Sequence, residues 1–305
     1  MTPMAPGAGS SRGMILIVVL WAVAMMTIVV VALSAFSQKS IATAGVEADR
    51  LRTEMALAAG IEAGKAIILA ARPEDRVFLD GQAVTVDIGN GRAVRISVRD
   101  AAGMVDLNRA DPELIEAFGS RLEAAIPGVQ SILEDVMKLR GNQTKEKEEA
   151  TAQPPETGET ASGDPPAPPY QPAILISTLQ LYGLANADPA AVDKLLPLIT
   201  LYSVDGKVNP MAAPVEIMSA IPGLQPKDAA VLTDARKLRQ RDSEAVQEVL
   251  AAAPKFLGIG QARVFNIAAA VVSGSGVIAG SRIQATAILD EGSAGPAFQI
   301  LSWSW

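Results

Sequence analysis

The stretch from Met14 to Phe36 carries no charged residue and is almost entirely apolar. An α-helix of that length reaches roughly 35 Å, which is enough to cross a hydrocarbon core of about 30 Å. The stretch therefore predicts one membrane-spanning helix. A short leader precedes it and ends in Arg12 and Gly13.

The helical pattern continues beyond the apolar stretch, from Ser37 to about Ala71, in a sequence rich in Ala, Glu and Leu. Apolar residues recur there in alternating steps of four and three and draw one stripe along a helix; they are Ala44, Ala48, Leu51, Met55 and Ala58. Pro73 ends this helix, because proline cannot continue it and disfavours the helical conformation of Arg72. We expect the stripe to cover one face of a sheet.

Alternating apolar and polar positions then predict strands between residues 77 and 100, beginning with Val77-Phe78-Leu79. Asn90-Gly91 separates two such runs and is a strong hairpin signal. Near the other end of the chain, three further segments have strand patterns: Phe265–Val272, Ile283–Leu289 and Phe298–Trp305. We expect residues near 77–100 and 262–305 to form one antiparallel sheet.

Between these strands, residues 105–255 have helical patterns. Asn108 or Asp111 is placed to cap a helix that has Pro112 and Glu113 in its first turn. A similar order of residues recurs at Val208–Met218, where it is followed by a Pro-Gly turn and a second helix. The region therefore predicts a weak internal repeat of helical hairpins.

The segment 141–172 differs from the rest of this region. It is dense in Pro, Gly, Thr and Glu and has few large apolar residues before Tyr170. Such a composition does not offset the entropy lost on ordering, so we interpret the segment as a disordered loop.

Three kinds of segment could explain the apolar stretch. A secretory signal peptide usually has a shorter apolar core, of about 7–15 residues. An ordinary single-pass anchor is the simplest alternative. The third is a pilin-like segment, in which a peptidase removes a short leader that ends in Gly.

The residues around Gly13 favour the third alternative. Arg12-Gly13 followed by Met14-Ile15-Leu16-Ile17-Val18 resembles the prepilin-peptidase site of pilins and pseudopilins. The resemblance implies cleavage between Gly13 and Met14 and N-methylation of Met14. Most members of that superfamily have Glu at the fifth mature position, where this chain has Val18. In this departure the chain resembles the K-type minor pseudopilin of type II secretion systems (general secretion pathway protein K).

Two further parts of the chain are similar to that family. Leu196–Asn209 is similar to the segment that follows the family's inserted helical domain, and the C-terminal strands are similar to those that complete its sheet. The implied fold is α+β: a long N-terminal transmembrane and amphipathic helix on an antiparallel pilin-like sheet, with an inserted helix-hairpin-helix or SAM-like domain. The corresponding parts are a leader (1–13), a transmembrane helix (14–36), a head (37–104 and 256–305) and an insert (105–255).

The implied function is non-enzymatic. Such a protein caps the tip of the secretion pseudopilus and helps to start its assembly, with the I- and J-type minor pseudopilins, the secretion platform and prepilin peptidase as partners. It lies in the bacterial inner membrane with a cytoplasmic N-terminus and a periplasmic body, an orientation that the charges flanking the apolar stretch weakly favour. Val18 suits the tip, because no neighbouring amine is present there to pair with a Glu.

Composition narrows the remaining chemistry. The chain has no Cys and no His, which excludes thiolate or imidazole zinc sites and Ser-His or Cys-His catalytic pairs. Its formal charge is −7 without a long basic cluster, which argues against a nucleic-acid surface. No spacing singles out a catalytic pair of carboxylates.

A membrane-anchored, competence-like DNA-binding protein with helix-hairpin-helix modules is the alternative function. Gly258-Ile259-Gly260 is similar to the turn of such modules. The nearby basic residues alternate with acidic ones, however, so a solvated helix face is the simpler interpretation and we expect no nucleic-acid partner. The basic residues are Lys227, Arg236, Lys237, Arg239 and Arg241.

Two polar residues have the chemistry of cation ligands. Asp106 and Asn108 could offer oxygen atoms to a hard cation such as Ca²⁺, but in front of a helix they favour capping. The family resemblance implies that calcium could bind near the position of the 141–172 segment. Asp164 is isolated among prolines there, so no ligand set can be assigned. Trp303 and Trp305 share one strand face and suggest a core or a subunit interface.

Overall fold

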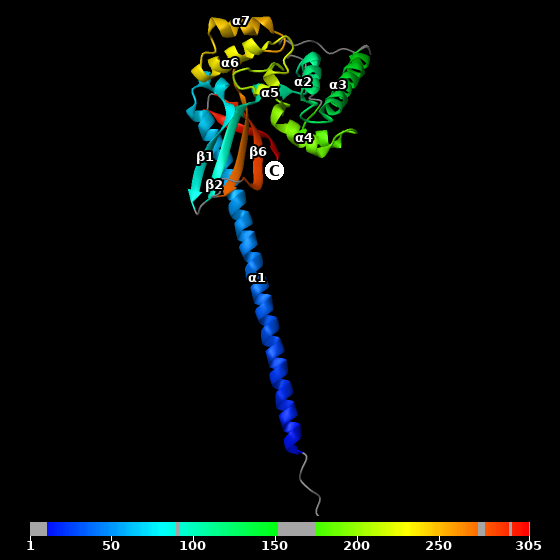
Figure 1. Cartoon of the computed structure of the whole chain (residues 1–305), viewed down its shortest axis with the longest axis vertical. Helices are drawn as coiled ribbons and strands as arrows, with labels where there is room; N and C mark the ends of the chain where they lie inside the picture. Colours follow the sequence, from blue (N-terminus) through cyan, green and yellow to red (C-terminus); the bar gives the residue numbers. More distant parts are fainter. Residues whose placement is uncertain (1–10, 90–91, 152–174, 274–277, 293–294, 305) are drawn as a thin grey trace, which may run out of the picture. The chain divides into compact units, whose positions relative to one another are not determined.

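The computed structural model describes residues 11–89, 92–151, 175–273, 278–292 and 295–304. It contains two compact units, Met1–Ala56 and Leu57–Trp305, and each is described by itself. The helix α1 (Ser11–Ala70) contributes residues to both. Figure 1 shows the elements in sequence colours.

The described residues of the first unit, from Ser11 to Ala56, belong to α1. The stretch Met14–Phe36 is the part of the described chain that is long and apolar enough to cross a membrane, and none of it is buried. The predicted apolar stripe continues after it, but its large side chains are exposed: Leu51 by 57% and Met55 by 65%. The prediction that this stripe covers the sheet is therefore wrong.

The helix residues that do cover the sheet belong to the second unit. Leu57, Ile61 and Ile68 are buried there. Gly60 and Gly64 allow α1 to approach strand β5, since a Cβ added to Gly60 would lie 2.7 Å from Cβ of Ala269. Alanine is spread around this helix, so apolar spacing alone is compatible with more than one face. The face that contacts the sheet is the one that carries Gly60 and Gly64, because these residues have no side chain to hold the helix away from β5.

The sheet has five antiparallel strands in the order β1-β2-β5-β6-β7. Their bounds are Asp80–Gly89, Arg92–Asp100, Val264–Ser273, Ile278–Asp290 and Ala297–Ser304. The predicted α+β class and the pairing of the early strands with the C-terminal ones are confirmed. The predicted turn at Asn90-Gly91 and the residue Trp305 lie outside the described residues.

The apolar residues of the first two strands differ in burial. Val94, Ile96 and Val98 of β2 are buried, whereas Val84 and Val86 of β1 are half exposed. In this sheet β1 pairs with β2 alone and forms an edge, where neighbouring residues cover a strand on one side only.

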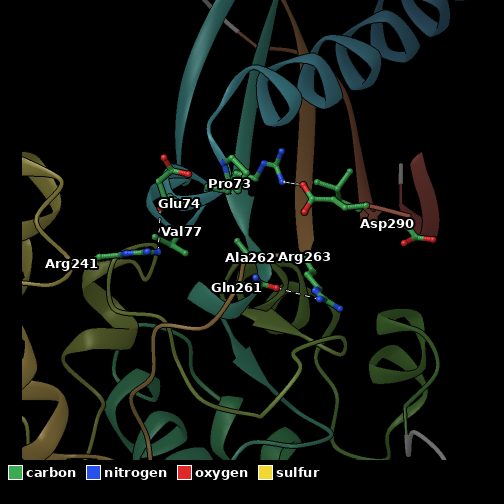
Figure 2. Close-up of a pocket in the computed structure, with 11 residues that line it drawn as sticks. Pro73, Glu74, Val77, Arg241, Gln261, Ala262, Arg263 and Asp290 are labelled. Atoms are coloured by element: carbon green, nitrogen blue, oxygen red, sulfur yellow. Dashed lines mark hydrogen bonds and ion pairs between the residues drawn. The ribbon is translucent and has the colours of Figure 1, made fainter. Parts of the chain in front are cut away.

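Val77-Phe78-Leu79 does not form a strand, contrary to the prediction. Pro73–Phe78 is a 3-10 helix, with the proline in its first turn. The Nε of Arg76 donates to the carbonyl oxygen of Ile68 at 3.1 Å, and its Nη1 pairs with Glu291 beyond β6. These contacts, in the region of Figure 2, fix the chain in a tight turn where α1 ends.

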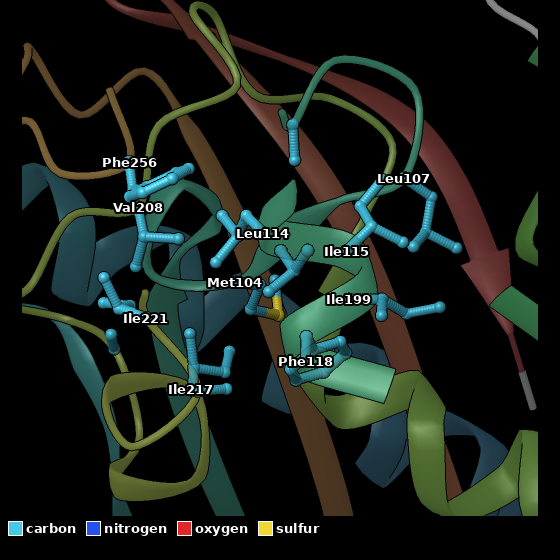
Figure 3. Close-up of a cluster of buried hydrophobic side chains, with 14 of the residues drawn as sticks. Met104, Leu107, Leu114, Ile115, Phe118, Ile199, Val208, Ile217, Ile221 and Phe256 are labelled. Carbon is cyan, nitrogen blue, oxygen red and sulfur yellow. The ribbon is translucent and has the colours of Figure 1, made fainter. Parts of the chain in front are cut away.

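The insert between β2 and β5 has its own core. Its helices are α2 (Pro112–Leu122), α3 (Val129–Thr151), α4 (Pro189–Leu195), α5 (Val215–Met218), α6 (Pro226–Leu238) and α7 (Glu244–Ala252), with 3-10 turns at Ala101–Gly103, Thr178–Gly183 and Leu196–Leu198. Figure 3 shows Leu114 and Phe118 of α2 gathered with Ile217 of α5 in one buried cluster. A parallel pair of short strands, β3 (Val105–Asp106) and β4 (Ile199–Thr200), was not predicted.

The internal repeat is confirmed and is more extensive than the predicted one. Ile126-Pro127-Gly128 turns the chain between α2 and α3, and Ile221-Pro222-Gly223 turns it between α5 and α6. Both glycines have positive φ, 86° and 79°, which a tight turn requires and other residues rarely adopt.

Each repeat also ends by pairing with its own beginning. Val105 pairs with Ile199 in parallel, and Val208 forms a parallel bridge to Leu257. The insert is therefore two tandem units of similar design, each closed by a parallel contact.

The helix α3 extends to Thr151, so the first part of the 141–172 segment is helical and not a loop. The residues 141–151 include several Lys and Glu residues, which have high helix propensity, and this propensity outweighs the polar composition on which the prediction relied. The remainder of the predicted loop lies outside the described residues.

Candidate functional site

The apolar part of α1 is the first candidate site. Its large side chains are exposed throughout, including Met14 by 70% and Val18 by 62%. The backbone groups of a helix bond within the helix, and the hydroxyl of Thr27 donates to the carbonyl oxygen of Val23 at 2.8 Å. A segment of this kind leaves few polar groups unsatisfied in a lipid environment.

The predicted processing residues lie at the start of the same helix. Gly13 and Met14 are in the first turns of α1, which begins at Ser11. Val18 follows Met14 by four residues and therefore lies on the same helix face. Cleavage after Gly13 and methylation of Met14 remain predictions.

Asp106, a candidate cation ligand, is buried in the insert with both carboxylate oxygens engaged. Its Oδ1 accepts from the backbone N–H groups of Asn108 at 2.7 Å and Arg109 at 3.0 Å, and its Oδ2 accepts from Ser203 N–H at 2.7 Å. Burial raises the pKa of this carboxyl, and the three hydrogen bonds oppose that shift. Asp106 thus connects the beginning and the end of the first repeat.

Asn108 has a similar role. Its Nδ2 donates to the carbonyl oxygen of Leu175 at 2.9 Å, and its Oδ1 accepts from the N–H of the same residue at 2.9 Å. The helix cap itself is Asp111, whose side chain accepts from Glu113 N–H at 2.9 Å. Among the described residues no group of three or more acidic side chains could hold a metal ion, and Asp164 lies outside them. Calcium binding therefore remains an expectation from the family resemblance.

The two helical hairpins were the candidate DNA-binding elements. In the first, the carboxylate of Glu123 accepts from Gly128 N–H at 2.8 Å and from Gln130 N–H at 2.9 Å, which lowers the pKa of Glu123. In the second, Asp228 accepts from Gln225 N–H at 3.0 Å. Helix N-termini of this kind can bind phosphate, but in this chain its own carboxylates occupy amides at both turns.

Gly258-Ile259-Gly260 does not lie between two helices. It follows α7 and leads into β5, and the N–H of Gly258 donates to the carbonyl oxygen of Val208 at 3.1 Å. The sequence similarity to a hairpin turn was therefore misleading at this position. The motif extends the closing contact of the second repeat.

Several of the basic residues near the hairpins make internal contacts. The Nη2 of Arg236 donates to the carbonyl oxygens of Pro210 and Ala213, at 2.6 Å each. Lys237 pairs with Asp234, Arg239 with Asp75 and Arg241 with Asp242, at 3.2, 3.5 and 3.4 Å. These contacts favour a structural role for this surface.

Sequence reasoning missed the buried pair Asp100 and Asn209. The Nδ2 of Asn209 donates to Oδ2 of Asp100 at 2.8 Å and to the carbonyl oxygen of Val77 at 2.9 Å. Its Oδ1 accepts from Met211 N–H at 2.9 Å. Burial raises the pKa of Asp100 to about 6. The internal repeat carried a signal for this pair, because Asn209 corresponds in position to the turn-forming Asp106.

Trp303 lies on the last strand, β7, and 47% of its surface is exposed. The proposal of a core position for it is therefore wrong, and a subunit contact remains a prediction.

Comparison of this chain with known proteins gives a structural similarity at low sequence identity. No family model matches the chain, and no curated protein matches its sequence. Among solved structures, the chain is similar to one in the crystal structure of the GspK-GspI-GspJ complex from the enterotoxigenic Escherichia coli type 2 secretion system. The sequence identity is 14% and the TM-score is 0.42, over 84% of this chain and 98% of the other.

Proposed function

We propose that this chain is a minor pseudopilin of the K type, which caps and nucleates the pseudopilus of a type II secretion system and has no enzymatic activity. One observation carries the proposal. The helix α1 contains the Gly13-Met14 junction in its first turns, continues through an uncharged stretch, and supplies the residues Leu57, Ile61 and Ile68 that pack on the antiparallel sheet.

Val18 supports the tip position within that class. A carboxylate in a lipid environment is costly unless it is paired. A subunit with another subunit above it can pair a Glu at this position with the neighbour's N-terminal amine, whereas a terminal subunit has no such partner. A valine at this position avoids the cost.

The partners follow from the same proposal. They are the I- and J-type minor pseudopilins, the secretion platform and prepilin peptidase. The chain would cross the inner membrane once, with its N-terminus in the cytoplasm and its sheet and insert in the periplasm.

The first test is the N-terminal mass of the mature chain, isolated from membranes of a host that supplies prepilin peptidase. We expect a chain that begins with N-methylated Met14. The substitution Gly13→Val should abolish the cleavage, whereas Gly9→Val, the same change within the leader, should leave it intact.

Three outcomes would contradict the proposal. They are an intact leader in the wild-type chain, a cut near Ala35 as for a signal peptide, or equal processing of the two glycine variants. A correctly processed chain that does not associate with minor pseudopilins would instead contradict only the tip assignment.

A further inference from the structure

The sheet has a polar row on the face opposite α1. Ile267 and Ala269 of β5 face the helix, so Asn266 faces the other side. Asn266 pairs with Thr286 of β6, and Thr286 pairs with Ser302 of β7. Residues that pair directly in this way share one face, which places an amide and two hydroxyl groups side by side.

A small cavity lies over this row, beneath the insert. Its volume is about 30 Å³, and the residues that line it include Asn266, Thr286 and Ser302 from the sheet and Thr200 and Tyr202 from the end of the first repeat. About 10–15 Å³ is enough to hold one water molecule. The cavity is thus large enough for water and too small for an organic ligand.

One polar atom at this place lacks a partner. Oδ1 of Asn266 is buried and accepts no hydrogen bond from the described protein groups. The Nδ2 of the same amide has only a distant sulfur acceptor, Sδ of Met104, at 3.8 Å. If the oxygen and nitrogen of the Asn266 amide were exchanged, the nitrogen would lie at this buried position, and its N–H groups would lack an acceptor instead.

We propose that the cavity holds one ordered water molecule, which donates to Oδ1 of Asn266 and bonds to the hydroxyl groups of Thr286 and Ser302. Two independent observations lead to this inference: a buried acceptor without a partner, and a polar-lined cavity of suitable volume beside it. Apolar cavities can stay dry, but a cavity with several hydrogen-bonding groups binds water. The insert therefore meets this part of the sheet through a hydrated contact.

The test is a crystal structure of the full chain in detergent, at a resolution that shows ordered water. We expect a density peak at about 2.8 Å from Oδ1 of Asn266 and from Oγ1 of Thr286. An empty cavity, or an Asn266 amide bonded directly to another protein group, would overturn the proposal.

Variants extend the test. Asn266→Leu should remove the peak, and Thr286→Val should lower its occupancy, whereas Thr85→Val, the same change at an exposed position of β1, should leave it unchanged. A peak that persists in the Asn266 variant would show that other groups hold the water. If that variant does not fold, unchanged occupancy in the Thr286 variant would overturn the inference in the same way.

Discussion

The side-chain amide of Asn209 donates a 2.8 Å hydrogen bond to the carboxylate of Asp100, which lies 109 residues earlier in the chain. Both residues are buried, with exposures of 1% and 3%. Asp100 ends β2, and Asn209 begins the second repeat of the insert. The contact therefore joins the sheet to the insert at a point where water cannot replace a lost partner.

Replacing Asn209 by Leu should destabilise the chain by about 2–4 kcal/mol, because it removes the hydrogen bonds that Asn209 makes to Oδ2 of Asp100, the carbonyl oxygen of Val77 and the N–H of Met211. The measurement is urea unfolding of the full chain in detergent. Asn186→Leu is the matched control: Asn186 is exposed and donates to Asp135 at 2.9 Å. Equal midpoints for the two variants would contradict the role given to Asn209.

The stability of the chain should fall as the pH rises from about 4 to about 6. Burial raises the pKa of Asp100 from 3.8 to about 6, so within this window the folded state keeps a proton that the unfolded state has released. The resulting stabilisation is complete below the window and is lost as the pH passes through it.

Asp100→Asn should reduce this slope in urea unfolding measured at several pH values. It should not abolish the slope, because burial also raises the pKa of Asp106. Asp242→Asn, at a side chain with 83% exposure, should keep the slope. An unchanged slope in the Asp100 variant would show that other groups titrate in this range.

Gly60→Ala should destabilise the second unit by about 1–3 kcal/mol, because its new methyl group would lie 2.7 Å from Cβ of Ala269, which cannot rotate away. Gly45→Ala offers a control in the same helix, with no atom within 4 Å of the added Cβ. Alanine has a higher helix propensity than glycine, so Gly45→Ala should leave the free energy of unfolding unchanged or raise it by up to about 1 kcal/mol. Thermal unfolding of both variants measures the difference, and similar midpoints would mean that the helix and β5 are not in close contact.

Val18→Glu tests the proposed tip position. A carboxylate within the membrane costs about 2.5–3.5 kcal/mol at a helix centre. At the tip this cost is not offset, so the amount of the Val18→Glu variant recovered with assembled filaments should be lower than that of the wild type. It should be about as low as the amount of the Val19→Glu variant. In a shaft position Val18→Glu would find an amine and be recovered better than Val19→Glu, which would refute the tip assignment.

The candidate site was only partly predictable from the sequence. Asp111 and Pro112 predicted the start of α2 because helix caps depend on neighbouring residues alone. Gly258-Ile259-Gly260 was misinterpreted because a Gly-x-Gly sequence can occur both at the turn of a helical hairpin and in the loop before a strand. Asp106 and Asn108 could have been caps or ligands, and only their contacts with Ser203 and Leu175 identified them as residues that close a repeat.

The sequence by itself determined the features that depend on local pattern: the uncharged stretch Met14–Phe36, the alternating strands and the two-part helical insert between them. Tertiary structure decided which groups meet across long separations. The helix face that covers the sheet was selected by Gly60 and Gly64, since alanines around the helix make several faces equally apolar. The pairing of Asp100 with Asn209 was likewise decided by the fold. The internal repeat indicated a turn-forming residue at Asn209 but not its partner, because a hydrogen bond between distant residues leaves no periodic pattern.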